Sequence, residues 1–144
     1  MKVLFAYILD KNDIRDDTAG YESMWVSEAE GGYRVDNIPF YAKGIAYGDI
    51  IAVEEEDGAY YFEELVEASG HSTVRVVFFD LSIMDEVKKK LLEIGCDWEG
   101  MKPDMPLLAV DIPPSIDYSI VKEYLGSGRS AGLWDYQEAC LGWK

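Results

Sequence analysis

The segment SGHSTVRV, residues 69–76, contains the side chains of this sequence that are best suited to acid–base chemistry. It holds His71, which is the single histidine of the chain. Hydroxyl and guanidinium groups surround it: Ser69, Ser72, Thr73 and Arg75. A histidine beside hydroxyl groups supplies the side-chain types that a general base and a nucleophile require. The same pattern also fits a polar turn at Gly70 that leads into a strand.

The known catalytic arrangements of histidine are incomplete here. A Ser-His-Asp triad needs a positioned nucleophile, and the G-x-S-x-G elbow is absent from the sequence. The HST triplet is similar to the motif of two-histidine phosphoesterases, but those enzymes need a second histidine as the partner acid or base. No catalytic residue is therefore assigned, and His71 remains the one candidate for that role.

Metal and cofactor motifs are also incomplete. One histidine and the distant Cys96 and Cys140 do not make a standard zinc site. The acidic run EEEDG at 54–58 lacks the spacing of a calcium loop and indicates the solvated tip of a hairpin. The stretch GSGRSAG at 126–132 lacks the lysine of a phosphate-binding loop and indicates a flexible turn. No metal and no cofactor are expected.

The charge of the chain restricts its partners. It carries 28 acidic and 13 basic residues, a net charge of −15. Nucleic acids and anionic membranes are disfavoured, whereas a basic protein would be attracted. Two cysteines do not form a disulfide framework, and the start MKVLFAYILDKND has no cleavage pattern of a signal peptide. No run approaches the roughly 20 apolar residues of a membrane span, so we expect a cytoplasmic protein.

The order of predicted elements indicates the α+β class. Short strands and turn signals over 1–80 predict a strand-rich subdomain, a small β-barrel or curled antiparallel sheet. Residues 81–144 predict a helix–strand–helix subdomain, a ferredoxin-like split β-α-β half packed on the first as one compact body.

Several details of the second subdomain follow from local signals. The first helix is expected after Ser82 as N-cap and before Gly95 as C-cap. A strand over 106–114 precedes a second helix that begins at Ser115 or Asp117 and is broken by the glycines from Gly126 onward. The segment 133–144 is expected to be a short helix or a docked tail.

Several motifs together resemble a bacterial family known only as a domain of unknown function, number 4265. The motifs are ESMWV (22–26), NIPF (37–40), the pair Gly48-Asp49 and SGHSTVR (69–75). The resemblance covers roughly residues 3–112. It implies a fold but no established activity.

Three interpretations of function remain open. The first is a non-enzymatic acidic protein-binding module, such as an immunity or antitoxin-like protein that neutralises a basic toxin. Its expected aromatic anchors are Tyr60, Tyr61, Trp134 and Trp143. The second is a small-ligand or phosphoester binder or hydrolase, and the third is a structural subunit of a homo-oligomer. The candidate binding residues are Asn37, Asp49, Ser69, His71, Ser72, Thr73 and Arg75. Asp49 is expected to accept turn amides or to pair with Arg75, with His71 between them.

Overall fold

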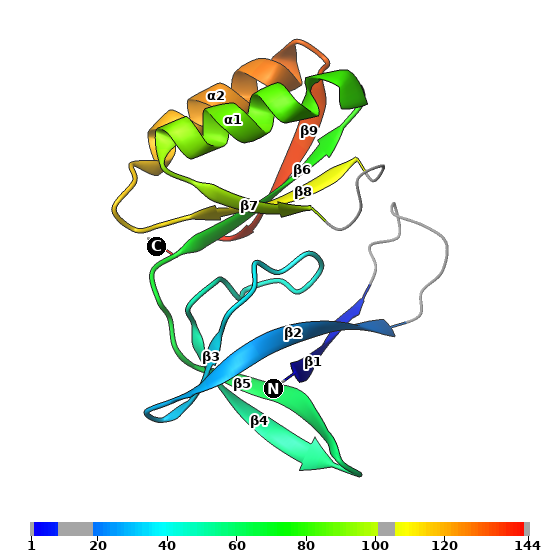
Figure 1. The fold of residues 1–144 in the computed structure, drawn as a ribbon, viewed down its shortest axis with the longest axis vertical. Coiled ribbons are helices and arrows are strands. Elements are labelled where there is room, and N and C mark those ends of the chain that lie inside the picture. Colours follow the sequence, from blue (N-terminus) through cyan, green and yellow to red (C-terminus); the bar gives the residue numbers. More distant parts are fainter. Residues whose placement is uncertain (1, 9–18, 101–105, 143–144) are drawn as a thin grey trace.

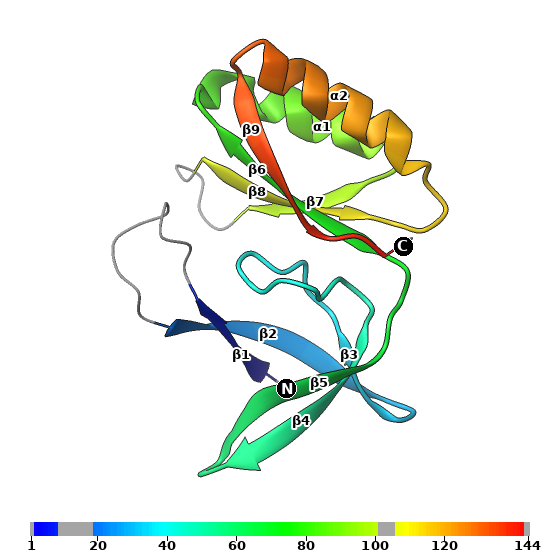
Figure 2. The same ribbon diagram turned by 180° about the vertical axis from the view of Figure 1, so that it is seen from behind.

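The computed structural model describes residues 2–8, 19–100 and 106–142. Two antiparallel sheets lie one below the other, and two helices cover the far face of the upper sheet (Figure 1). The chain completes the first sheet before it begins the second, as the colour gradient in Figures 1 and 2 shows. The predicted α+β fold in one compact body is confirmed.

The first sheet is a curled meander. Its consecutive strands pair antiparallel in the order β1(Lys2–Ile8), β2(Ala19–Ala29), β3(Gly32–Val35), β4(Ile50–Glu56) and β5(Ala59–Glu67). The sheet curls until its first and last strands meet at the single parallel pair Leu4–Tyr61. Its interior is apolar, with Val3, Met24 and Ile51 almost completely buried. Short strands with a buried face favour this closure because it leaves fewer free edges.

The second sheet has ferredoxin-like topology. The chain runs β6(Ser72–Phe78), α1(Met84–Ile94), β7(Asp97–Gly100), β8(Leu107–Ile112), α2(Tyr118–Ser130) and β9(Trp134–Cys140). The strand order in space is β7-β8-β6-β9, with all neighbours antiparallel. This is the β-α-β-β-α-β arrangement, so the predicted split β-α-β half is confirmed.

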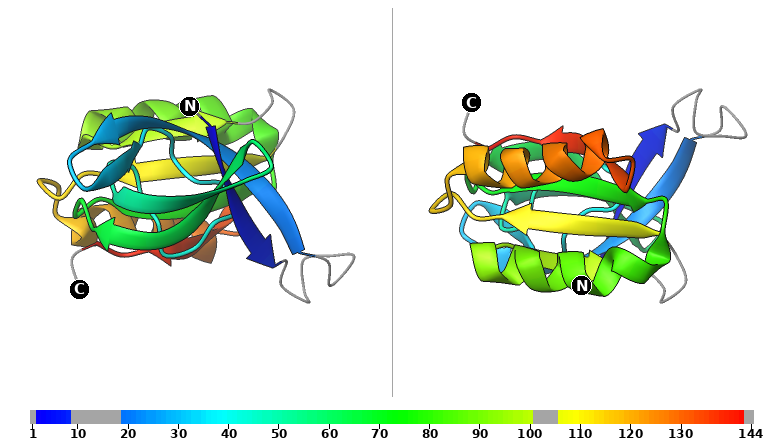
Figure 3. Two further views of the ribbon diagram at one scale, coloured as in Figure 1. Left: turned by 90° about the horizontal axis from the view of Figure 1, so that it is seen from below. Right: turned by 90° about the horizontal axis from the view of Figure 1, so that it is seen from above.

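The core of this second unit lies between its sheet and its helices, which lie side by side over the strands (Figure 3). On β6, Val74, Val76 and Phe78 enter that core, as strand alternation predicts. Thr73 and Arg75 therefore lie on the opposite face, toward the first sheet. This face holds Thr73 and Arg75, and the segment 36–49, which runs between the two sheets in Figure 1, holds Asn37 and Asp49.

Three local predictions are wrong. Residues 134–140 form strand β9 rather than a helix or tail. The GSGRSAG stretch is largely helical, because α2 continues through Gly126 and Gly128 to Ser130. Ser82 does not cap α1. Its amide donates a hydrogen bond to the Asp80 side chain, in a 3₁₀ turn that precedes the helix. The residue at the N-cap of α1 is Ile83, whose side chain makes no capping hydrogen bond.

Two cap predictions hold. Gly95 ends α1 in the left-handed conformation, with φ 112°. Asp117 caps α2 by accepting a hydrogen bond from the amide of Ser119. The strand over 72–78 falls within the predicted 1–80 subdomain but is a central strand of the second sheet, so the two sheets divide the chain between β5 and β6.

Candidate functional site

His71 lies just before β6, where the chain crosses from the first sheet to the second. Its Nδ1 lies 2.8 Å from Oδ1 and 3.1 Å from Oδ2 of Asp111 on β8. The Asp111 side chain is 7% exposed and that of His71 is 22% exposed. Burial raises the pKa of the Asp111 carboxyl, and the hydrogen bond with His71 opposes that shift. The pair fixes the imidazole ring through Nδ1 and leaves the Nε2 edge for another partner.

A second carboxylate, Asp49, organises the turn before His71. Its Oδ2 accepts the amide of Ala46 at 2.9 Å, and its Oδ1 accepts the amide of Ser69 at 2.8 Å. Ser69 Oγ lies 2.9 Å from the same Oδ1 and accepts the His71 amide at 3.2 Å. Gly48 precedes this carboxylate with φ 85°, and a Cβ there would lie 3.2 Å from Ser69 Cβ. The motif residues Gly48, Asp49, Ser69 and His71 thus build one connected turn.

Thr73 and Arg75 attach the segment 36–49 to the second sheet. Thr73 Oγ1 lies 3.4 Å from the carbonyl of Ile45, and Arg75 Nη2 donates to the carbonyl of Ala42. Arg75 Nη1 lies 3.4 Å from Gln137 Oε1. Of the two alternatives predicted for Asp49, acceptance of turn amides is confirmed and pairing with Arg75 is wrong: the hydrogen-bond acceptors described around Arg75 are neutral oxygens. Burial lowers the pKa of Arg75, while the charge of Glu22 acts in the opposite direction.

Two of the candidate residues lie apart from this group. Asn37 Oδ1 accepts the amide of Trp25 in the first sheet. Ser72 is buried, and its Oγ accepts the amide of Gly142 at 3.0 Å. Both side chains hold backbone in place.

A cavity of about 560 Å³ opens beside His71. Its walls combine apolar side chains with the imidazole and a half-buried thiol: Leu65, Ala68, His71, Ala139, Cys140 and Leu141 contribute, with Gly44, Asp49, Glu138 and Gly142. The ring of Tyr47 packs on the imidazole, with centroids 5.5 Å apart. One oriented imidazole in a cavity of mixed polar and apolar lining fits ligand binding better than hydrolysis, which needs an assembled nucleophile and oxyanion site.

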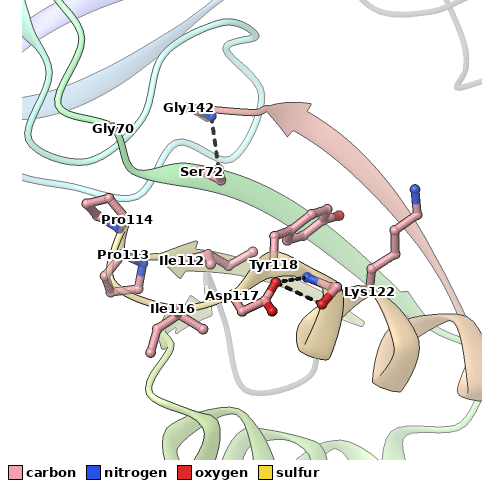
Figure 4. Close-up of a pocket in the computed structure, with 11 residues that line it drawn as sticks. Gly70, Ser72, Ile112, Pro113, Pro114, Ile116, Asp117, Tyr118, Lys122 and Gly142 are labelled. Carbon is pink, nitrogen blue, oxygen red and sulfur yellow. Dashed lines mark hydrogen bonds between the residues drawn. The ribbon is translucent and has the colours of Figure 1, made fainter. Parts of the chain in front are cut away.

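A second cavity of about 540 Å³ lies between the end of β8 and the start of α2 (Figure 4). Pro113, Pro114 and Ile116 give it an apolar wall. The carboxylate of Asp117 accepts hydrogen bonds from the amide and hydroxyl of Ser119, at 3.0 and 2.8 Å. This acid is engaged in capping α2, so it is poorly placed for chemistry on a ligand.

The predicted aromatic anchors have different surroundings. Trp134 is 4% exposed, and its indole N–H donates to the carbonyl of Leu125 at 2.9 Å. It is a core residue, and its prediction as an anchor is wrong. Tyr60 and Tyr61 are half-buried on β5, and Trp143 lies outside the described residues.

Asp111 and Tyr47 contact His71 and were missed in the sequence analysis. Asp111 had a readable signal, because it is the one charged residue in the apolar run LLAVDI of β8. A carboxylate in such a strand needs a partner. Tyr47 offered no comparable signal. In the part of the chain that the structure describes, no three His, Cys, Asp or Glu side chains gather to hold a metal, and no helix is long and apolar enough to cross a membrane.

Comparison with known proteins gives a family and a fold. A solved structure described as a novel crystal structure of a hypothetical protein from Neisseria gonorrhoeae superposes with a TM-score of 0.85 and 26% sequence identity. The alignment covers 99% of this chain and 96% of that one. A search of curated proteins gives no match. The family model described as "Domain of unknown function (DUF4265)" matches residues 22–136. The chain therefore belongs to the DUF4265 family.

Proposed function

We propose that this chain is a non-enzymatic, acidic protein-binding module whose β4–β5 hairpin docks a basic protein. The observation that carries this proposal is a concentration of charge. The hairpin bears seven exposed carboxylates and no lysine or arginine: Glu54, Glu55, Glu56, Asp57, Glu63, Glu64 and Glu67. Its tip extends away from the helices and past the rest of the first sheet (Figures 1 and 2).

Apolar contact area accompanies the charge. Leu65 and Val66 on β5 are 41% and 49% exposed and stand between Glu64 and Glu67. Interfaces commonly pair an apolar centre with a charged rim that steers the partner into place. With a net charge of −15, association with a basic partner would be fast and weakened by salt.

The proposal extends to a class of partner. Proteins that act on nucleic acids are basic because they bind phosphates, so an acidic hairpin is complementary to their active sites. We therefore propose an immunity or antitoxin-like role in the bacterial cytoplasm. The half-buried Tyr60 and Tyr61 on the same hairpin are the remaining candidates for aromatic contacts.

The direct test uses the product of the adjacent gene, co-expressed and purified with this chain. The hairpin variant E54Q/E56Q/E64Q is compared with D85N/E86Q/E93Q on α1, which removes equal charge from exposed helix positions. We expect the hairpin variant to weaken binding about tenfold, or about 1.4 kcal/mol. The helix variant should bind nearly as the native chain does. Equal losses of affinity in both variants, or an affinity that does not change with salt, would contradict the proposal. Light scattering on the same samples tests the alternative that the chain forms a homo-oligomer.

A second candidate function, binding of a small ligand, is favoured by the cavity beside His71. The Nδ1–Asp111 contact fixes the ring, and His71 lines the cavity. Screening of a fragment library by NMR should perturb the ring signals of His71 if this function is correct, and His71→Ala should abolish the effect. Hits that bind the folded His71→Ala variant equally well would exclude it.

A further inference from the structure

Strand β4 is paired along one edge only for most of its length. β5 pairs with it from Ile50 to Glu56. β3 pairs with it at Ile50 and Ile51 alone, and the residues from Ala52 to Glu56 have no other described backbone partner. The outer edge of β4 is thus exposed over this stretch, next to the tip of the hairpin (Figure 2).

The turn geometry identifies which backbone groups face outward. Asp57 and Gly58 both have positive φ, 52° and 84°, as a two-residue type I′ turn requires. The closing pair Glu56–Ala59 is hydrogen-bonded in such a turn, and bonded and non-bonded pairs alternate along the ladder. Val53 and Glu55 therefore direct their N–H and C=O groups away from β5. These groups are the template onto which an extended segment adds as a further strand.

The side chains on this edge define the charge of the segment that fits. Glu54, Glu55 and Glu56 are consecutive and exposed. Successive residues of a strand point to opposite faces, so both faces of this edge carry carboxylates. A strand lying alongside would place its side chains opposite them, where cross-strand pairs of opposite charge are favourable. An added strand with consecutive lysines or arginines would place a basic side chain opposite the carboxylates on both faces. A strand with a basic residue at every second position would do so on one face only.

The same argument excludes a second copy of this chain as the occupant. Two β4 edges brought together would oppose glutamates to glutamates on both faces, and directly opposed like charges are destabilising. We infer that the outer edge of β4 receives an extended segment of the basic partner, with consecutive Lys or Arg residues opposite Glu54, Glu55 and Glu56. This inference rests on the proposed docking function and adds the mode of recognition and the sequence pattern recognised.

The decisive probe is a short synthetic peptide with a run of arginines flanked by valine and threonine. Its matched control has the same sequence and charge, with the backbone nitrogens of alternate arginines methylated so that they cannot donate to β4. We expect the parent peptide to bind about tenfold more tightly than the control, because the control loses ladder hydrogen bonds. The parent should also slow exchange of the Glu55 amide hydrogen.

Two outcomes overturn the inference. Equal affinity of the two peptides means that charge alone is recognised. Absence of binding by either peptide at low salt means that the edge receives no such segment. Neither outcome contradicts the docking proposal itself. That proposal fails if the E54Q/E56Q/E64Q variant binds the adjacent gene product as tightly as the native chain does.

A pair of variants gives the complementary test on the protein side. Glu55→Pro removes the outward N–H without removing a bond to β5, and proline is tolerated on an edge strand. Glu55→Gln removes the same charge but keeps the N–H. The proline variant should bind the parent peptide about tenfold more weakly than the glutamine variant; equal binding by the two folded variants contradicts the inference. Circular dichroism checks that both variants fold. If the proline variant does not fold, the inference is tested by the affinities of the parent and methylated peptides for the native chain.

Discussion

His71 and Asp111 are 40 residues apart in the sequence, yet Nδ1 of the imidazole lies 2.8 Å from Oδ1 of the carboxylate. The contact joins the start of β6 to the end of β8, because Ser72 lies opposite Ile112 and Thr73 opposite Asp111 in that pair. An ionised carboxylate accepts hydrogen bonds and cannot donate them, so it holds the proton of the neutral ring on Nδ1. Nε2 of the neutral ring is then an acceptor.

The first prediction concerns this tautomer. Nitrogen-15 shifts of the His71 ring in the native chain should report a proton on Nδ1 when the ring is neutral. Asp111→Asn replaces the obligate acceptor with an amide that also donates, so the preference for Nδ1–H should weaken. Asp135→Asn is the control, since Asp135 pairs with Arg129 at the surface and makes no described contact with His71. An unchanged tautomer ratio in Asp111→Asn would show that Asp111 does not orient the ring.

The second prediction concerns Asp49, whose buried carboxylate accepts the amides of Ala46 and Ser69 and lies 2.9 Å from Ser69 Oγ. Asp49→Ala leaves these donors without their acceptor and should lower the free energy of unfolding by about 3 kcal/mol. Asp135→Ala is the matched control: its carboxylate is 53% exposed and pairs with Arg129, and its loss should cost under about 1 kcal/mol. Denaturant unfolding measures both. Similar losses would mean that the Asp49 turn contributes no more than a surface ion pair.

Some of this fold follows directly from sequence periodicity. The alternation of Val74, Val76 and Phe78 with Thr73 and Arg75 predicts the two faces of β6, and the structure buries the first set in the helical core. Gly95 predicts the left-handed end of α1 for a local steric reason. Such features depend on a few neighbouring residues, so a single sequence reveals them.

Other features depend on tertiary contacts. The partner of His71 follows from the register of β6 and β8, which no local pattern determines. Pairing with Asp49 was one alternative expected for Arg75, but the segment 36–49 brings the carbonyl of Ala42 to it. The glycines of α2 were interpreted as a break because isolated glycine weakens a helix, and the packing of Trp134 against Gly128 reverses that interpretation.

That packing gives the third prediction. A Cβ on Gly128 would lie 1.9 Å from Cζ2 of Trp134, whereas a Cβ on Gly126 of the same helix would meet nothing within 4 Å. Gly128→Ala should therefore destabilise the protein by about 3 kcal/mol through overpacking. Gly126→Ala should stabilise it by about 0.5–1 kcal/mol, because alanine is the better helix former. Thermal unfolding of the two variants gives the signs, and a stabilising Gly128→Ala would contradict the described packing.

The fourth prediction concerns Cys96, which follows α1 and is 2% exposed. Burial raises the pKa of its thiol from 9.0 to about 11. Above pH 9 the unfolded chain releases this proton while the folded chain retains it, so the thiol's contribution to stability should fall as the pH rises from 9 toward 11. Tyrosines titrate in the same range, so the measured quantity is the difference in unfolding free energy between the native chain and Cys96→Ala. That difference should shrink between pH 9 and 11 if the buried thiol resists ionisation. A difference that is constant with pH would show that Cys96 ionises as readily in the folded chain as in the unfolded one.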